Sequence, residues 1–150
     1  MVTTVAEPIF IDTNVLVFAT IPSSPMHRPA LAALHAIALS GAETWISRQI
    51  IREFLVYLTR PGVFKSTTAS SAAAGQAASL ASIYQIADET PAVTTQLLDL
   101  LRAIGANGKQ IHDANIVATM QVYGIRRLLT HNVSDFKRYS SLITVIPFQP

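Results

Sequence analysis

Cysteine is absent from the 150 residues of this chain. Its absence excludes disulfides, thiol nucleophiles, and zinc or iron–sulfur sites that use cysteine ligands. Charged residues are also scarce, at 13% of the chain, against about a quarter in typical domains. Because 50% of the residues are hydrophobic, the composition predicts a well-filled core or an apolar partner surface and argues against disorder.

Two kinds of targeting segment are missing as well. No basic residue precedes Ile9, so the N-terminus does not resemble a secretory signal. The apolar stretch at residues 30–42 contains polar residues and is too short to span a bilayer. We therefore expect a cytoplasmic protein without a membrane contact. The length fits a single domain covering residues 1–150, and the net charge of +2 adds only weak support for a nucleic-acid partner.

The first hydrophobic segment runs from Ile9 to Ile11 and ends at an acid. Its branched and aromatic residues predict a short buried strand. Thr13 and Asn14 favour helix N-termini, and a second apolar run follows them. Asp12 therefore either stands at the carboxyl end of a strand, where open α/β sheets bind ligands, or simply caps the next helix.

Further strands and helices alternate along the chain. The pattern predicts strands at residues 45–46, 83–87, 128–130 and 142–146, helices at residues 29–39, 48–58, 66–82, 92–104 and 111–123, and a helical turn at residues 135–139. Alternating elements of this kind form βαβ units with right-handed crossovers around a parallel sheet. The predicted fold class is therefore α/β, without repeats or a domain boundary.

Only nine acidic residues are present, and four of them stand beside apolar core segments. These four are Asp12, Glu53, Asp113 and Asp135. Each also fits a structural role when taken singly. Glu53 can pair with Arg48 or Arg52 on the surface. The helix dipole favours Asp113 in the first turn of a predicted helix, and Asp135 can bond its own turn.

Together, the four carboxylates predict a cation site. If the sheet brings Asp12 and Asp135 beside Asp113, each close pair of like charges costs about 4 kcal/mol at an effective dielectric of about 20. A helix cap contributes only about 1 kcal/mol, so capping does not explain such a cluster. Hard carboxylate oxygens suit Mg²⁺ or Mn²⁺, which supply a Lewis acid together with bound water.

Four short motifs occur in an order that resembles the PIN domain. They are Asp12-Thr13-Asn14 after a strand, Arg52-Glu53-Phe54 in a helix, His112-Asp113-Ala114 at a helix start, and Thr130-His131-Asn132 followed by Asp135-Phe136. The pattern is similar to that of the VapC-type toxin ribonucleases of bacterial toxin–antitoxin pairs. The resemblance implies a PIN-like three-layer α/β/α sandwich with a central, mostly parallel sheet.

The resemblance also implies a site and an activity. The catalytic and metal-binding quartet of the family corresponds to Asp12, Glu53, Asp113 and Asp135. The polar residues around that quartet correspond to Thr13, Asn14, Thr130 and Asn132. His112 matches a frequent companion of the third acid, although a packed or helix-capping histidine explains it equally well. The implied activity is Mg²⁺- or Mn²⁺-dependent endonucleolytic cleavage of RNA. The implied partners are a VapB-like antitoxin, which covers the active site, and a second copy of the chain.

Basic residues provide candidates for contacts with the RNA backbone. Those flanking the last acidic motif rank highest and are Arg126, Arg127, Lys137 and Arg138. The remaining candidates are Arg48, Arg52, Arg60, Lys65 and Lys109. Ordinary surface charge is the competing explanation for each of them.

Other classes of protein also place an acid at a strand end. Haloacid-dehalogenase-type phosphatases require a second Asp two residues after the first, where this chain has Asn14. Response-regulator receivers require a Lys before a proline on the last strand, and residues 145–147 contain none. A further alternative is a non-catalytic protein- or RNA-binding module whose apolar helices, at residues 29–39 and 66–82, contact a partner.

Overall fold

The computed structural model describes residues 5–62 and 67–148. Its strands form one sheet in the order β3-β2-β1-β4-β5. The strands are β1 (Ile9–Ile11), β2 (Thr44–Ser47), β3 (Gln85–Ala87), β4 (Arg127–Leu129) and β5 (Thr144–Ile146). Every neighbouring pair is parallel, which confirms the α/β fold class and the parallel sheet expected from the sequence.

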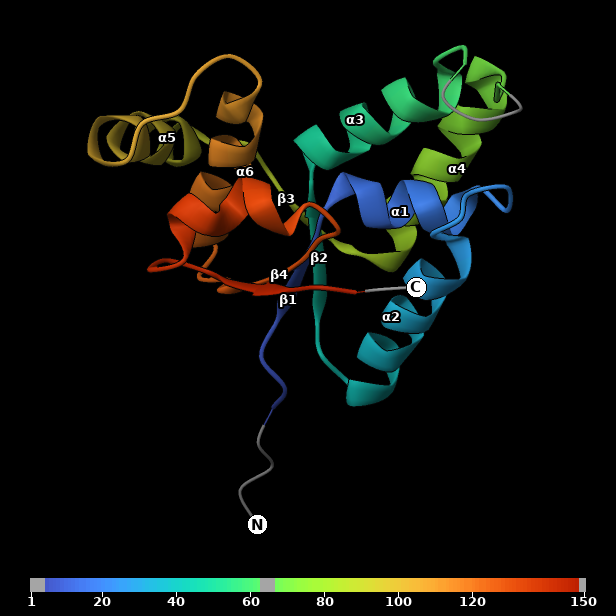
Figure 1. The fold of residues 1–150 in the computed structure, drawn as a ribbon, viewed down its shortest axis with the longest axis horizontal. Coiled ribbons are helices and arrows are strands. Elements are labelled where there is room, and N and C mark those ends of the chain that lie inside the picture. Colours follow the sequence, from blue (N-terminus) through green and yellow to red (C-terminus); the bar gives the residue numbers. More distant parts are fainter. Residues whose placement is uncertain (1–4, 63–66, 149–150) are drawn as a thin grey trace.

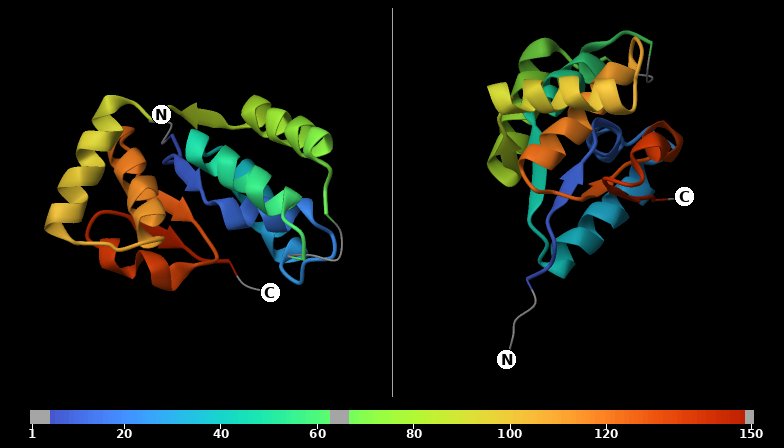
Figure 2. Two further views of the ribbon diagram at one scale, coloured as in Figure 1. Left: turned by 90° about the horizontal axis from the view of Figure 1, so that it is seen from above. Right: turned by 90° about the vertical axis from the view of Figure 1, so that its left-hand side faces the viewer.

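Helices cover both faces of this sheet (Figures 1 and 2). They are α1 (Thr13–Thr20), α2 (His27–Ser40), α3 (Arg48–Thr59), α4 (Ser70–Ile83), α5 (Pro91–Ala103), α6 (Gln110–Val122) and the 3₁₀ helix η1 (Val133–Tyr139). Helices α1 to α4 lie on one face, and α5, α6 and η1 lie on the other. The result is the three-layer α/β/α sandwich. No helix within residues 5–62 and 67–148 is long and apolar enough to cross a membrane.

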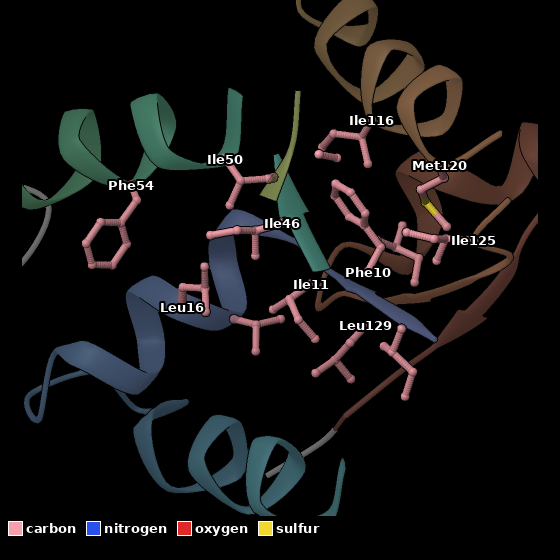
Figure 3. Packing of buried hydrophobic residues seen from close by; sticks show 14 of the residues in the cluster. Phe10, Ile11, Leu16, Ile46, Ile50, Phe54, Ile116, Met120, Ile125 and Leu129 are labelled. Atoms are coloured by element: carbon pink, nitrogen blue, oxygen red, sulfur yellow. The ribbon is translucent and has the colours of Figure 1, made fainter. Parts of the chain in front are cut away.

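Strand β1 lies at the centre of the core. Its three residues are at most 1% exposed, as expected for a strand whose two faces are both covered by helices. Phe10 faces the α6 layer beside Ile116, whereas Ile11 points toward Leu16 of α1 (Figure 3). Full burial of such side chains contributes about 1.5–3 kcal/mol each, so the position of β1 is firmly set.

The strand order creates a switch point between β1 and β4. The chain leaves β1 through α1 and α2 to reach β2, whereas it enters β4 from β3 through α5 and α6 on the other face. Open α/β sheets have their ligand crevice at the carboxyl ends of two such strands. Asp12 directly follows β1 and Thr130 directly follows β4. The backbone N–H of Asp12 donates to the carbonyl of Leu129 at 3.0 Å.

Two predicted strands begin too early. Ile83 and Tyr84 do not belong to β3, because the N–H of Tyr84 still donates to the carbonyl of Leu80 at 3.0 Å and continues α4. Leu142 donates to the carbonyl of Tyr139 at 2.8 Å in a helix-like turn, so β5 begins at Thr144. Helix α4 begins at Ser70, and the predicted start at Ser66 lies outside the described residues.

Candidate active site

Asp12 is buried at the carboxyl end of β1 with both carboxylate oxygens bonded. Its Oδ1 accepts from the N–H of Thr13 at 2.7 Å, so Asp12 itself is the N-cap of α1, ahead of the predicted caps Thr13 and Asn14. Its Oδ2 accepts from the Thr130 hydroxyl at 2.6 Å and from Nδ2 of Asn14 at 2.8 Å. The sequence left open whether Asp12 caps the helix or stands at the ligand-binding end of a strand. The structure shows that it does both.

Burial raises the pKa of Asp12 from 3.8 to about 6. Hydrogen bonds from Thr130, Thr13 and Asn14 act in the opposite direction, and the negative charge of Glu53 adds to the rise. A carboxylate that remains buried beside another acid is costly in the folded protein. The site therefore stores unfavourable charge that a bound cation would relieve.

Glu53 projects from α3 toward the same place. Its Oε2 accepts from the Thr13 hydroxyl at 2.5 Å, and its Oε1 accepts from Nε2 of Gln49 at 2.8 Å. The alternative surface pairing with Arg48 or Arg52 is wrong. Arg48 pairs with Asp88 and Arg52 pairs with Glu89, each at 2.9 Å.

Asp113 occupies the first turn of α6, as predicted, and is half-buried. Burial raises its pKa to about 7, and the charges of Asp12, Asp135 and Glu53 contribute further, in that order. The structure thus brings all four predicted acids within electrostatic reach of one another, although they lie up to 123 positions apart in the sequence (Asp12 to Asp135). Arg138 opposes this rise only in part.

Three of the four acids share a cavity of about 530 Å³, namely Asp12, Glu53 and Asp113. The predicted polar residues that also line this cavity are Thr13, Asn14, His112 and Asn132. Thr130 does not line the cavity. It is buried and supports Asp12 through the hydrogen bond from its hydroxyl. Asp135 is exposed in the first turn of η1 and does not line the cavity either. The charge of Asp135 therefore still acts on Asp113, but its side chain does not line the cavity with the other three acids.

Neither Gln49 nor Asn115 is predicted from the sequence, yet both support the site. Gln49 is only 5% exposed and donates to Glu53 and to the carbonyl oxygen of His112, while Asn115 donates to Gln49 at 2.7 Å. The spacing of Gln49 and Glu53 is a signal that points to Gln49, because residues four apart lie on the same face of a helix. Asn115 has no comparable signal, since its partner is 66 positions away.

The ranking of the basic residues needs correction. Arg127 pairs in register with Ile9 at the start of β1, and its guanidinium donates to the carbonyl of Glu7 at 3.2 Å. Arg126 precedes it, so both arginines lie at the amino ends of the strands, away from the acidic cavity. Arg126 and Arg127 are close in sequence to the last acidic motif but not in space. Strand β4 separates them, with the arginines at its amino end and the acidic motif after its carboxyl end.

Other basic residues lie closer to the acids. The cations that line the cavity are Arg52, Arg60 and Lys109, which rank lower on sequence alone. Lys137 and Arg138 occupy the last turn of η1, and Arg138 donates to the carbonyl of Gly105 at 3.1 Å. Lys65 lies outside the described residues.

The donors around the cavity suit a hard cation. They are carboxylate, hydroxyl and amide oxygens, which Mg²⁺ and Mn²⁺ prefer. Within residues 5–62 and 67–148, no three acidic or histidine side chains form a ready-made ligand group. Mg²⁺ is usually held by one or two carboxylates together with several waters, and the cavity wall offers the carboxylates of Asp12, Glu53 and Asp113.

The fold and the site together define a PIN-like α/β/α protein, with acids at the switch point of a parallel sheet. The chain belongs to the PIN domain family, which it matches over residues 9–142. No curated protein is significantly similar to it in sequence.

Several solved structures share this fold. VapBC2 from Rickettsia felis, bound to a promoter DNA fragment, is 19% identical with a TM-score of 0.68, over 94% of this chain and 98% of that chain. VapC20 from Mycobacterium tuberculosis, a sarcin–ricin loop cleaving toxin, is 17% identical with a TM-score of 0.66, over 91% and 96%. A toxin–antitoxin complex from Klebsiella pneumoniae is 21% identical with a TM-score of 0.65, over 91% and 96%.

Proposed function

We propose that this protein is a metal-dependent endoribonuclease and the toxin of a VapBC-type toxin–antitoxin pair. The observation that carries the proposal is the convergence of Asp12, Glu53 and Asp113 on one cavity at the switch point of the sheet. Membership of the PIN domain family supports it. The likeness of the fold to VapC20, a sarcin–ricin loop cleaving toxin, adds further support.

In this proposal the acids hold Mg²⁺ or Mn²⁺. Asp12 and Asp113 are the principal ligands, directly or through water, because both line the cavity, one from the end of β1 and one from the first turn of α6. A cation bound there would lower their raised pKa values. Asp135 adds negative charge from η1, and Glu53 holds a second ion or orients the attacking water. The bound ion supplies Lewis acidity and a water that is deprotonated more easily than bulk water.

The rest of the cavity is suited to an RNA backbone. The carboxylates alone would repel a phosphodiester, so the substrate needs cations on the same wall. Arg60 and Lys109 line the cavity with the acids and are assigned this role. Asn132 is exposed and lines the cavity, so its side-chain amide can orient a phosphate oxygen by a hydrogen bond, whereas both amide hydrogens of Asn14 are already bonded to Asp12 and Thr130.

Exposed apolar side chains fit the proposed partners. Val56 and Tyr57 of α3 are 59% and 42% exposed and line the cavity beside Glu53. A segment of the proposed antitoxin that covers the active site would bury them. On α2, Leu31 and Leu39 are 45% and 77% exposed, and we assign this face to the contact with a second copy of the chain.

The decisive experiment compares the purified protein with its Asp12→Asn variant on single-stranded RNA, with Mg²⁺, with Mn²⁺ and with excess chelator. We expect cleavage only with metal, and loss of at least a hundredfold in rate in the variant. Asp99→Asn is the matched control, because Asp99 is an exposed acid paired with Arg102 outside the cavity. Cleavage by Asp12→Asn at the parental rate would refute the proposal. RNA binding without cleavage would instead favour a non-catalytic module.

A further inference from the structure

The side-chain amide of Gln49 is fully bonded in the wall of the cavity. Its Nε2 donates to Oε1 of Glu53 at 2.8 Å and to the carbonyl oxygen of His112 at 3.0 Å. Its Oε1 accepts from Nδ2 of Asn115 at 2.7 Å. A primary amide has two N–H donors, and both are used here. Turning the amide over would set its oxygen against two acceptors, so the neighbours fix its orientation.

Neutral donors hold both oxygens of Glu53. The Thr13 hydroxyl donates to Oε2 on the side opposite Gln49. The arginines of α3 do not compete for this carboxylate, because Arg48 and Arg52 pair with Asp88 and Glu89. A neutral donor orients a carboxylate without cancelling its charge, whereas an arginine would do both. Both oxygens of Glu53 are therefore oriented by neutral donors, from α1 on one oxygen and from Gln49 on the other.

Gln49 also connects the two helices that carry acids of the site. The carbonyl that it binds belongs to His112, one residue before Asp113 in the first turn of α6. Asn115, its third partner, lies on the same helix. A single buried side chain thus joins the carboxylate of Glu53 to the segment that presents Asp113.

We propose that Gln49 is a positioning residue that holds Glu53 and the start of α6 in the arrangement that receives a divalent cation. The proposal rests on the proposed function for the use of that cation. Partners that orient metal ligands in this way typically change metal affinity by about 10–100-fold when they are removed. Gln49 is therefore expected to affect metal binding although it binds no metal itself.

The test compares Gln49→Met with Gln96→Met. Methionine keeps the approximate length of glutamine and removes the amide. Gln96 is the matched control, because its Nε2 donates to Oε1 of Gln121 at 2.9 Å and joins α5 to α6 outside the cavity. Mn²⁺ affinity is measured directly by isothermal titration calorimetry. We expect Gln49→Met to lose about 10–100-fold in affinity and Gln96→Met to stay within about twofold of the parent. Equal affinities in the two variants would overturn the proposal.

A second measurement asks whether Gln49 acts through Glu53. In a Glu53→Gln background, adding Gln49→Met should cause a smaller further loss of Mn²⁺ affinity than it causes in the parent, because the carboxylate is gone and only the contact with the start of α6 remains to be lost. A full further loss in that background would contradict the proposal. If Gln49→Met does not fold, Asn115→Ala removes one bond to the amide and should still weaken Mn²⁺ binding more than Gln96→Met does. Parental affinity in Asn115→Ala would then count against the proposal.

The outcome is separable from that of the proposed function. RNA cleavage by the parent and its loss in Asp12→Asn judge the ribonuclease, whereas the Mn²⁺ titrations judge Gln49 without any RNA. A parent that binds Mn²⁺ but does not cleave RNA leaves the role of Gln49 measurable. A parent that cleaves RNA while Gln49→Met matches Gln96→Met would overturn only the role of Gln49.

Discussion

The Thr130 hydroxyl donates a 2.6 Å hydrogen bond to Oδ2 of Asp12, across 118 positions of sequence. The same hydroxyl oxygen accepts from the N–H of Asn132 at 3.0 Å and from Nδ2 of Asn14 at 3.2 Å. These two donors direct the hydroxyl hydrogen toward Asp12. Thr130 is fully buried, so the bond forms away from water and joins the carboxyl ends of β1 and β4.

Thr130→Val tests this bond with little change in volume. The variant leaves the buried Asp12 carboxylate without its shortest donor, and we expect the free energy of unfolding at pH 8 to fall by about 1–3 kcal/mol. Thr119→Val is the control, because Thr119 is equally buried and donates to the carbonyl of Asn115 within α6. Denaturant unfolding should show a smaller loss for Thr119→Val. Equal losses would show that the bond to Asp12 has no special weight.

The sequence predicts those parts of the site that follow directly from local pattern. A buried strand that ends in an acid, with helix-starting residues after it, is sufficient to place Asp12 at the edge of the sheet. Asp113 is placed equally well, because a first-turn acid and the helix period are both visible in the chain. For Glu53, the sequence predicts the helix but not the choice between the cavity and a surface ion pair. Packing of α3 against α1 decides that choice.

Closeness in sequence is a poor guide to closeness in space where a strand separates the two residues. This is why Arg126 and Arg127 are ranked too high as RNA contacts. Each strand residue advances the chain by about 3.3 Å. Arg127 and Thr130 are therefore about 10 Å apart, one at the amino end of β4 and the other just beyond its carboxyl end. The prediction that Asp135 lines the site with the other three acids is wrong for another reason. Asp135 lies in a 3₁₀ turn whose orientation depends on the burial of Phe136 and Tyr139, which sequence alone does not fix.

The stability of the metal-free protein should fall as the pH rises. Asp113 has a folded-state pKa of about 7, above its unfolded value of 3.8. Its contribution is therefore fully present below about pH 4 and is lost as the pH rises through about 7. Asp113→Asn removes this penalty, so we expect thermal unfolding at pH 8 to occur at a higher temperature than in the parent, and the two proteins to agree near pH 4. After allowance for solvent screening at this half-buried group, the gain at pH 8 is on the order of 2 kcal/mol. A variant less stable than the parent at pH 8 would contradict this prediction.

Added metal should reverse that trend. A ligand that binds only the folded state at 100 times its dissociation constant stabilises it by about 2.7 kcal/mol. Protons compete for Asp12 and Asp113, whose raised pKa values lie near 6 and 7, so the stabilisation by Mn²⁺ should be larger at pH 8 than at pH 5. Thermal unfolding with Mn²⁺ and with chelator measures the difference at each pH. Asp12→Asn should lose most of it, and equal stabilisation at both pH values would argue against binding through these acids.

The position of the cavity cations predicts how RNA binding depends on salt. Each phosphate contact in a single strand contributes about 0.7 to the slope of log affinity against log salt concentration. In an Asp12→Asn background, which prevents cleavage, replacing both Arg60 and Lys109 by Ala should therefore weaken binding and reduce the slope by about 1.4. The matched control replaces Arg126 and Arg127 by Ala. This removes the same charge from the amino ends of the strands, away from the cavity. Fluorescence anisotropy with a labelled single-stranded RNA at several salt concentrations measures both pairs. If the two pairs reduce the slope equally, RNA follows net charge and not the acidic cavity, and the assignment of Arg60 and Lys109 as its phosphate contacts is wrong.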